Sequence, residues 1–359
     1  MTLEGERERM VAPSGKNLSI EWLRLLLAAG VVVYHFFWYL PLRGVAGAGP
    51  MGPDWLMYGR FGVEAFFIIS GYVIAFSMVG RSAADFVASR VSRLYPALVL
   101  CASLTFLAIL ARDDMQAVPG AINLVADWLF VPLVAGIGQI DPAYWSIVVE
   151  LRFYLLVLVL LLLGVSHRLL LLLTVFSVSA TSLALFGLGD PWLGWLLFPH
   201  ASYFALGVLL RHVRTRGVSA FAVAVAALHL YCAGIGTWYG MAIIDLQDGV
   251  RSPVWVGGLI PSGCFALVGL AVFLPMSRGS RKMARAAIFA GGVSYPLYLV
   301  HQVVGLTLSD LFAARLPDTM AVMLALLCIG AIAASVHVAV ERRTRPRLRA
   351  AVARRLGAG

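Results

Sequence analysis

The chain has 359 residues, of which 61% are hydrophobic and 13% are charged, and its formal net charge is +10. About a quarter of the residues of a soluble domain are charged, so this composition excludes a soluble globular protein and indicates an integral membrane protein. The net charge does not require a nucleic-acid partner, because most of it lies in short segments between apolar stretches and in the tail Arg342 to Arg355. A basic tail of this kind would contact anionic lipid headgroups.

Apolar stretches of about 20 residues, each long enough to span a bilayer, recur along the whole chain. They predict an all-α, polytopic helical membrane bundle of about ten transmembrane helices, at residues 18–40, 59–80, 94–111, 143–164, 168–187, 191–210, 217–240, 254–275, 286–308 and 319–341. The region 118–138 is less apolar and favours a re-entrant or interfacial piece. No linker divides the chain, so we predict one membrane domain (18–341), an N-terminal segment (1–17) and a basic tail (342–359).

The basic residues alternate between the two sides of this predicted bundle. One side collects most of the arginines, including the seven between Arg342 and Arg355, and positive residues are retained on the cytoplasmic side of a membrane. We therefore predict that both termini are cytoplasmic and that the protein is a multi-pass protein of the cell (inner) membrane. We also predict no cleaved signal peptide. The four cysteines lie in apolar stretches without metal-binding spacing, so no metal site is expected.

Ionisable residues inside the apolar stretches mark the candidate functional site, because such residues in a membrane usually serve function. The first stretch contains both Arg24 and His35, and the second contains Glu64. Arg90 and Arg93 stand three residues apart, so both guanidinium groups lie on one helical face, which suits a phosphate group. Topology alone also explains arginines at the inner membrane edge.

Four ionisable side chains of the apolar stretches are predicted to lie at a similar depth in the membrane. With a rise of 1.5 Å per residue, His35 lies roughly 25 Å above the cytoplasmic edge, Glu64 and Glu150 roughly 20 Å, and His301 roughly 22 Å. A carboxylate in hydrocarbon needs a cationic or hydrogen-bonding partner. We therefore expect Glu150 to pair with His35 in a layer in the outer half of the membrane.

Five stretches resemble, in the same order, the motifs of membrane-bound acyltransferase family 3. The spacing from Arg24 to His35 resembles the family's Arg-x10-His signature. Four further blocks follow along nearly the whole chain, at residues 62–72 (GVEAFFIISGY), 86–96 (with both arginines of the Arg-x-x-Arg element), 144–154 (with Tyr-Trp-Ser) and 294–301 (SYPLYLVH).

The resemblance implies an integral membrane O-acyltransferase of sugars and related acceptors. It implies acetyl-CoA or another acyl-CoA as a co-substrate, not a bound cofactor, and a carbohydrate or lipid-linked glycan as the acceptor. Arg24, Arg90 and Arg93 would hold the phosphates of the donor. His35 would act as general base, oriented by Glu150, in direct transfer or through an acyl-histidine. The further candidates for acceptor or oxyanion contacts are Glu64, Ser70, Trp145, Ser146, Tyr295 and His301.

Two rival functions fit parts of the same pattern. A proton-coupled transporter or flippase would use His35, Glu64, Glu150 and His301 as a proton relay. Against this reading stand the missing internal repeat and the arginine cluster, which a proton relay does not need. A purely structural membrane subunit would leave the buried charges without purpose.

Overall fold

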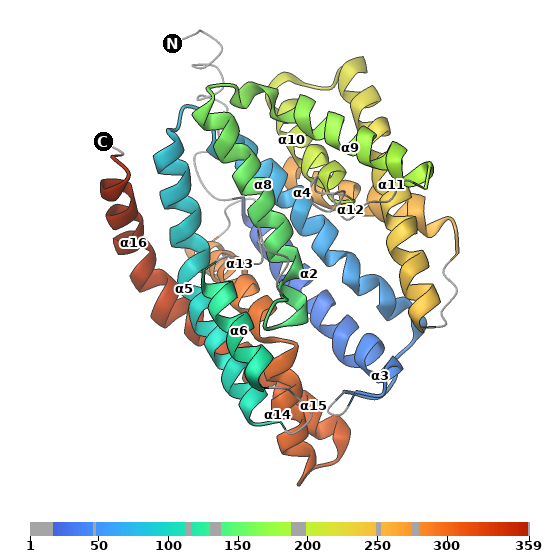
Figure 1. The fold of residues 1–359 in the computed structure, drawn as a ribbon, viewed down its shortest axis with the longest axis vertical. Coiled ribbons are helices and arrows are strands. Elements are labelled where there is room, and N and C mark those ends of the chain that lie inside the picture. The colour runs from blue at the N-terminus through green and yellow to red at the C-terminus, as the bar shows by residue number, and fades with distance from the viewer. Residues whose placement is uncertain are drawn as a thin grey trace. The chain divides into compact units, whose positions relative to one another are not determined.

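The computed structural model describes residues 17–45, 48–112, 117–129, 138–187, 199–248, 253–274 and 280–357 (Figure 1). Within these ranges every regular element is a helix, as the sequence predicts. The chain divides into two compact units. Unit 1 comprises Met1–Leu23, Phe61–Phe86 and Arg152–Ala284, and unit 2 comprises Arg24–Arg60, Val87–Leu151 and Arg285–Gly359.

Each unit is built from helices contributed by distant parts of the chain. Unit 1 contains α4 (Gly62–Ser77), η4 (Ser166–Arg168), α9 (Leu169–Leu185), α10 (Ala201–Arg216), α11 (Ala220–Asp248) and α12 (Val256–Phe273). Unit 2 contains η1 (His35–Tyr39), α3 (Leu40–Leu42), α6 (Ala117–Trp128), η3 (Pro142–Tyr144), α14 (Val303–Ala313), α15 (Asp318–Ser335), η6 (Val336–Glu341) and α16 (Arg342–Arg355). The elements with residues in both units are α2 (Leu18–Tyr34), η2 (Asp54–Phe61), α5 (Ala83–Leu110), α8 (Trp145–Leu162) and α13 (Arg281–Val300).

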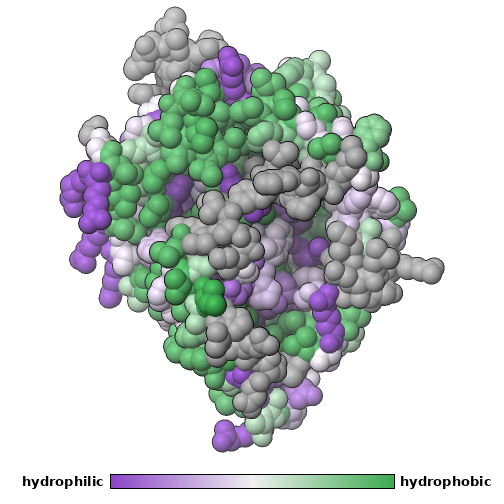
Figure 2. Space-filling model, in the orientation of Figure 1, coloured by the Kyte–Doolittle hydropathy of each residue, from purple (hydrophilic) through white to green (hydrophobic). Residues whose placement is uncertain are grey.

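Nine helical segments of the described chain are long and apolar enough to cross a bilayer. The tenth predicted span, 191–210, lies partly outside the described residues, and its described part belongs to α10, which has 16 residues. Of the region 118–138, residues 130–137 lie outside the described residues, and the described part contains most of α6, whose 12 residues are too short to span a membrane. Large apolar side chains such as Leu162 and Leu327 are exposed, as expected for lipid-facing helices, and hydrophobic residues cover much of the face drawn in Figure 2.

Two predicted spans have different boundaries in the structure. The span predicted at 94–111 is part of α5, which begins at Ala83, so Arg90 and Arg93 belong to the same helix as the predicted span. The span predicted at 286–308 is two helices, because α13 ends at Val300 and α14 begins at Val303. Pro96 and Pro296 both lie inside helices, where each removes one backbone hydrogen bond.

The centre of unit 1 is the contact between α4 and α10. Two glycines make this contact close: a Cβ on Gly71 would overlap the carbonyl oxygen of Phe204, and a Cβ on Gly207 would overlap that of Ile68. Small residues let helix backbones approach in membrane proteins, where packing rather than water exclusion drives association. The two glycines therefore set the distance between these helices.

Unit 2 contains two short π-helical segments, each of which includes a histidine. One is η1, which begins at His35 where α2 ends, and the other is η6, whose second residue is His337. His337 lies against Gly292 of α13, where a Cβ would overlap its ring, and its Nδ1 is 2.7 Å from Glu341 Oε2. His337 therefore has a packing and hydrogen-bonding role.

Candidate functional site

The candidate site is built around two histidines of unit 2 that are 266 residues apart in sequence. His35 Nδ1 lies 3.2 Å from His301 Nε2, and the ring centroids are 4.9 Å apart. His35 is half-buried, whereas His301 is fully buried in the turn between α13 and α14. The structure thus brings together two of the four residues that the sequence places at a common depth.

The hydrogen bonds of this pair determine where the protons lie. His301 Nδ1 is 2.6 Å from the carbonyl oxygen of Tyr298, so it must carry a proton and donate it. The Nε2 of a neutral His301 is then an acceptor. His35 Nδ1 lies 2.9 Å from the carbonyl oxygen of Val31, one helical turn earlier, and faces His301 Nε2 as well. Two acceptors around His35 Nδ1 fix its proton there and leave Nε2 with a lone pair.

A polar network holds the turn that carries His301. The Tyr144 hydroxyl donates to the Leu299 carbonyl at 3.0 Å, and the Tyr298 hydroxyl donates to the Ala143 carbonyl at 2.8 Å. Ser146 Oγ lies 2.8 Å from the same Tyr298 hydroxyl. Backbone groups released where the helix breaks are thereby satisfied by the segment that begins α8, as buried backbone groups require.

Asp141 completes this network and was not among the site residues predicted from the sequence. It is fully buried just before the span that begins at Pro142, and it accepts hydrogen bonds from the N–H groups of Ala143 and Val303. Burial raises the pKa of its carboxyl to about 7, although these two hydrogen bonds oppose the shift. An Asp followed by Pro is a helix N-terminus signature, and this signal could have identified it.

The structure does not show the predicted pairing of His35 with Glu150. The groups in hydrogen-bonding reach of His35 are the Val31 carbonyl and His301, not the carboxylate of Glu150. Glu150 is half-buried on α8. An imidazole and a carbonyl take the place of the expected carboxylate because the helix break at His301 directs a second ring toward α2.

The three arginines lie on two helices of unit 2. Arg24 is eleven residues before His35 on α2, which places both on one helical face and about 16 Å apart along the axis. Arg90 is buried on α5 and donates from Nη2 to Ser89 Oγ at 2.9 Å, while Arg93, one turn later, is half-buried. Arg24 lies in the first half of α2 and His35 directly follows its last residue, so the two polar side chains are well separated along this helix.

The remaining predicted residues lie as follows. Trp145 begins α8 and is 39% exposed, and the Tyr295 hydroxyl donates to the Leu94 carbonyl at 3.4 Å. Glu64, which is buried, and Ser70, which is half-buried, belong to α4 in unit 1. Among the described residues no group of three His, Cys, Asp or Glu side chains is arranged to hold a metal ion.

A family model described as an acyltransferase domain (acyltransferase family 3) matches residues 17–340. Over 323 residues, covering 80% of this chain and 73% of the relative, the chain is 28% identical to a putative membrane-bound transacylase, BcsY, of Komagataeibacter xylinus. No solved structure matches.

Two further relatives match over a shorter part of the chain. The O-acetyltransferase OatA of Staphylococcus aureus is 29% identical over 159 residues, which cover 38% of this chain and 23% of that protein. Nodulation protein 10 of Rhizobium leguminosarum bv. viciae is 28% identical over 165 residues, covering 40% of this chain and 43% of that protein. The chain thus spans less than half of each of these two relatives.

Proposed function

The chain belongs to the acyltransferase family whose model covers residues 17–340, and it is a multi-pass membrane acyltransferase. From this premise we propose that it transfers an acetyl or other acyl group from acyl-CoA to a hydroxyl of a carbohydrate, such as a surface polysaccharide or a lipid-linked glycan. The name O-acetyltransferase of one relative supports acetyl as the group and oxygen as the acceptor atom. The transporter reading has no comparable support.

One observation carries the proposed chemistry, namely the two acceptors that face His35 Nδ1, from which its tautomer is inferred. With its proton on Nδ1, facing Val31 and His301, the Nε2 lone pair takes the proton of the acceptor hydroxyl as its oxygen attacks the thioester carbonyl carbon. The tetrahedral intermediate collapses with cleavage of the C–S bond, and the imidazolium returns the proton to the CoA thiolate. The product is an ester and free CoA.

His301 takes the role that the sequence assigned to Glu150. When His35 becomes positively charged, its Nδ1–H faces two acceptors, the Val31 carbonyl and His301 Nε2, and both stabilise the charge. The hydrogen bond from His301 Nδ1 to Tyr298 keeps that Nε2 available. Trp145 and Tyr295 remain proposed oxyanion donors, and Ser146 remains a proposed acceptor contact.

Charge supports a donor site at the arginine end of α2. Arg24, Arg90 and Arg93 would hold the phosphates of acyl-CoA, which guanidinium groups bind through paired hydrogen bonds. The distribution of arginines also supports cytoplasmic termini and a position in the cell (inner) membrane. The basic helix α16, where hydrophilic side chains gather in Figure 2, would contact anionic lipid headgroups.

Turnover of labelled acetyl-CoA tests the proposal directly. The purified protein in nanodiscs should release free CoA and transfer the label to a glycoside when a panel of methyl glycosides is supplied. Release of CoA without label transfer to any glycoside would refute the carbohydrate acceptor. A correctly folded protein that neither binds nor consumes acetyl-CoA would refute the donor.

Arg93→Ala should weaken use of the donor. We expect the KM for acetyl-CoA to rise about tenfold with a smaller change in kcat, because a charge-assisted hydrogen bond to phosphate is lost. Steady-state kinetics at varied acetyl-CoA measure this. Arg81→Ala is the matched control, since Arg81 is exposed in the turn before α5. Equal KM values for the two variants would leave Arg93 with a topological role alone.

A further inference from the structure

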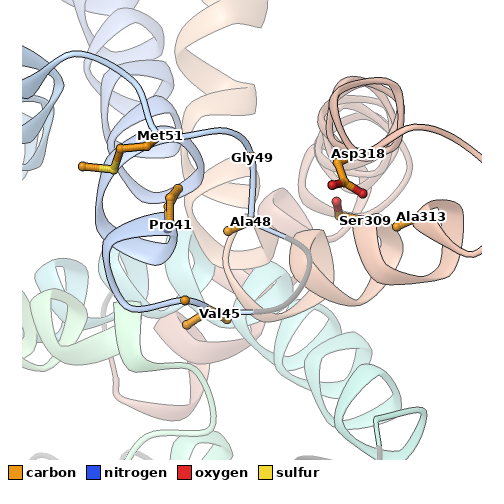
Figure 3. A pocket seen from close by; sticks show the side chains of 9 residues that line it. Pro41, Val45, Ala48, Gly49, Met51, Ser309, Ala313 and Asp318 are labelled. Carbon is orange, nitrogen blue, oxygen red and sulfur yellow. The ribbon is translucent and has the colours of Figure 1, made fainter.

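A pocket of about 450 Å³ lies in unit 2, beyond the end of η1. Its walls come from α3 and the segment that follows it, from the C-terminal half of α14, and from the first residue of α15 (Figure 3). A volume of this size is typical of a small-molecule site. We propose that it binds the acceptor, a neutral polyhydroxylated ring of the pyranose type, and this inference rests on the proposed acyl transfer to a hydroxyl.

The strongest sign of a ligand is Ser309. Its side chain is 1% exposed, and its Oγ has no hydrogen-bond partner in the structure. A serine on a helix ordinarily bonds the carbonyl four residues earlier, as Thr307 does with Val303 at 2.9 Å. A buried hydroxyl without a partner has lost its hydrogen bonds to water, and a bound ligand hydroxyl would replace them.

Asp318 gives the pocket its second polar group. Figure 3 shows its carboxylate and the Ser309 hydroxyl turned toward each other on one side of the pocket, although no hydrogen bond joins them. A carboxylate accepts hydrogen bonds from hydroxyl groups and can receive two at once. A carboxylate and a serine separated in this way form a cradle for a ring hydroxyl.

The charge of the pocket selects the acceptor over the donor. No lysine or arginine is among its described lining residues, and Asp318 is the charged residue there. The phosphates of acyl-CoA would be repelled by this carboxylate. The apolar walls, formed by Pro41, Met51 and Ala313, suit the aliphatic C–H surface of a sugar ring.

Two helical segments, η1 and α14, connect the pocket to the histidine pair. On α14, Gly305 and Ser309 follow His301 at intervals of four residues, and Gly305 packs against the Phe36 ring. Ser309 is thus about 9 Å along the axis from Val303, the first residue of α14 after the turn that carries His301. The pocket segment is also tied to η1, because Gly49 N–H donates to the Phe36 carbonyl at 2.9 Å and Gly52 N–H to the Phe37 carbonyl at 2.7 Å. A ring in the pocket can therefore direct a hydroxyl, or the next sugar unit, toward His35.

Kinetics with varied acceptor test the proposal in the full-length protein in nanodiscs. The probe is the best methyl glycoside of the panel, with acetyl-CoA held constant. We expect the glycoside KM to rise about fivefold in Ser309→Ala and about tenfold in Asp318→Asn, with the KM for acetyl-CoA unchanged. Ala313→Leu fills the pocket without removing a polar group, and should also raise the glycoside KM.

Matched controls separate the pocket from general effects on folding. Thr307→Ala removes a hydroxyl from the same helix, and Asp54→Asn removes an exposed carboxylate from a neighbouring segment. Both should keep the glycoside KM of the parent. Wild-type kinetics in all three pocket variants would overturn the acceptor site while the acyl transfer stands. A lowered KM for acetyl-CoA in Asp318→Asn would assign the pocket to the donor. No glycoside-dependent CoA release by the wild type would refute the proposed function as well.

Discussion

His35→Ala is expected to lower acyl transfer by about a hundredfold to ten-thousandfold while leaving the protein inserted and folded. The variant removes the Nε2 lone pair that accepts the hydroxyl proton, and general base catalysis typically contributes a factor of this size. Its partners are the Val31 carbonyl and the buried His301, so the loss of the ring breaks no ion pair. The measurement is CoA release and label transfer at saturating acetyl-CoA.

His167→Ala is the control for a histidine without a catalytic role, because His167 is exposed in the short helix η4. His301→Ala should lower kcat by less than His35→Ala, since Val31 still accepts from His35 Nδ1. Near-normal turnover of His35→Ala would disprove the general-base assignment. A loss of activity accompanied by a lowered unfolding temperature would show that the ring is needed for structure instead.

Gly207→Ala should produce the largest loss of stability among single-methyl substitutions in unit 1. The added Cβ would overlap the Ile68 carbonyl oxygen and lie 2.6 Å from the Tyr72 backbone nitrogen, so two backbones must separate. Overpacking of this kind costs about 1–3 kcal/mol, and the unfolding temperature should fall by about 2–10 °C. Thermal unfolding in detergent, followed by tryptophan fluorescence, measures the shift.

Gly263→Ala is the matched control, because a Cβ at this position of α12 meets nothing within 4 Å. Alanine has the higher helix propensity, so this variant should be as stable as the parent or slightly more stable. If the two variants unfolded at the same temperature, the close contact between α4 and α10 would not limit stability.

Composition and hydropathy predicted the helical membrane architecture because the bilayer imposes both the length and the apolarity of each span. The spans predicted at 143–164 and 254–275 differ by at most two residues at each end from the observed segments Pro142–Leu162 and Val256–Phe273. The helix α5 was predicted to begin eleven residues too late, because its first turns carry polar and charged residues that hydropathy excludes. Hydropathy locates the apolar core of a span and not the ends of its helix.

The sequence predicted the depth of the site residues in the membrane, but not the direction in which each side chain points. Counting residues from the membrane edge placed His35 and His301 within a few ångströms of the same height, and the structure brings them into contact. Depth does not tell which side of a helix faces which neighbour. Glu150 was therefore predicted to be the partner of His35, whereas the observed partner is His301. The helix break after Val300, on which this contact depends, lies within a continuous apolar stretch that hydropathy assigns to one helix.

The π-helical turn at η1 has a consequence for how such chains diversify. A π turn corresponds to one residue inserted into an α-helix, and each added residue rotates all later positions by about 100° around the axis. Deleting one residue within His35–Tyr39 would keep Arg24 and His35 aligned but turn Pro41 and the following segment to another side. Deletion of a single codon would thus change the residues that line the proposed acceptor pocket and leave the arginines of the proposed donor site in place.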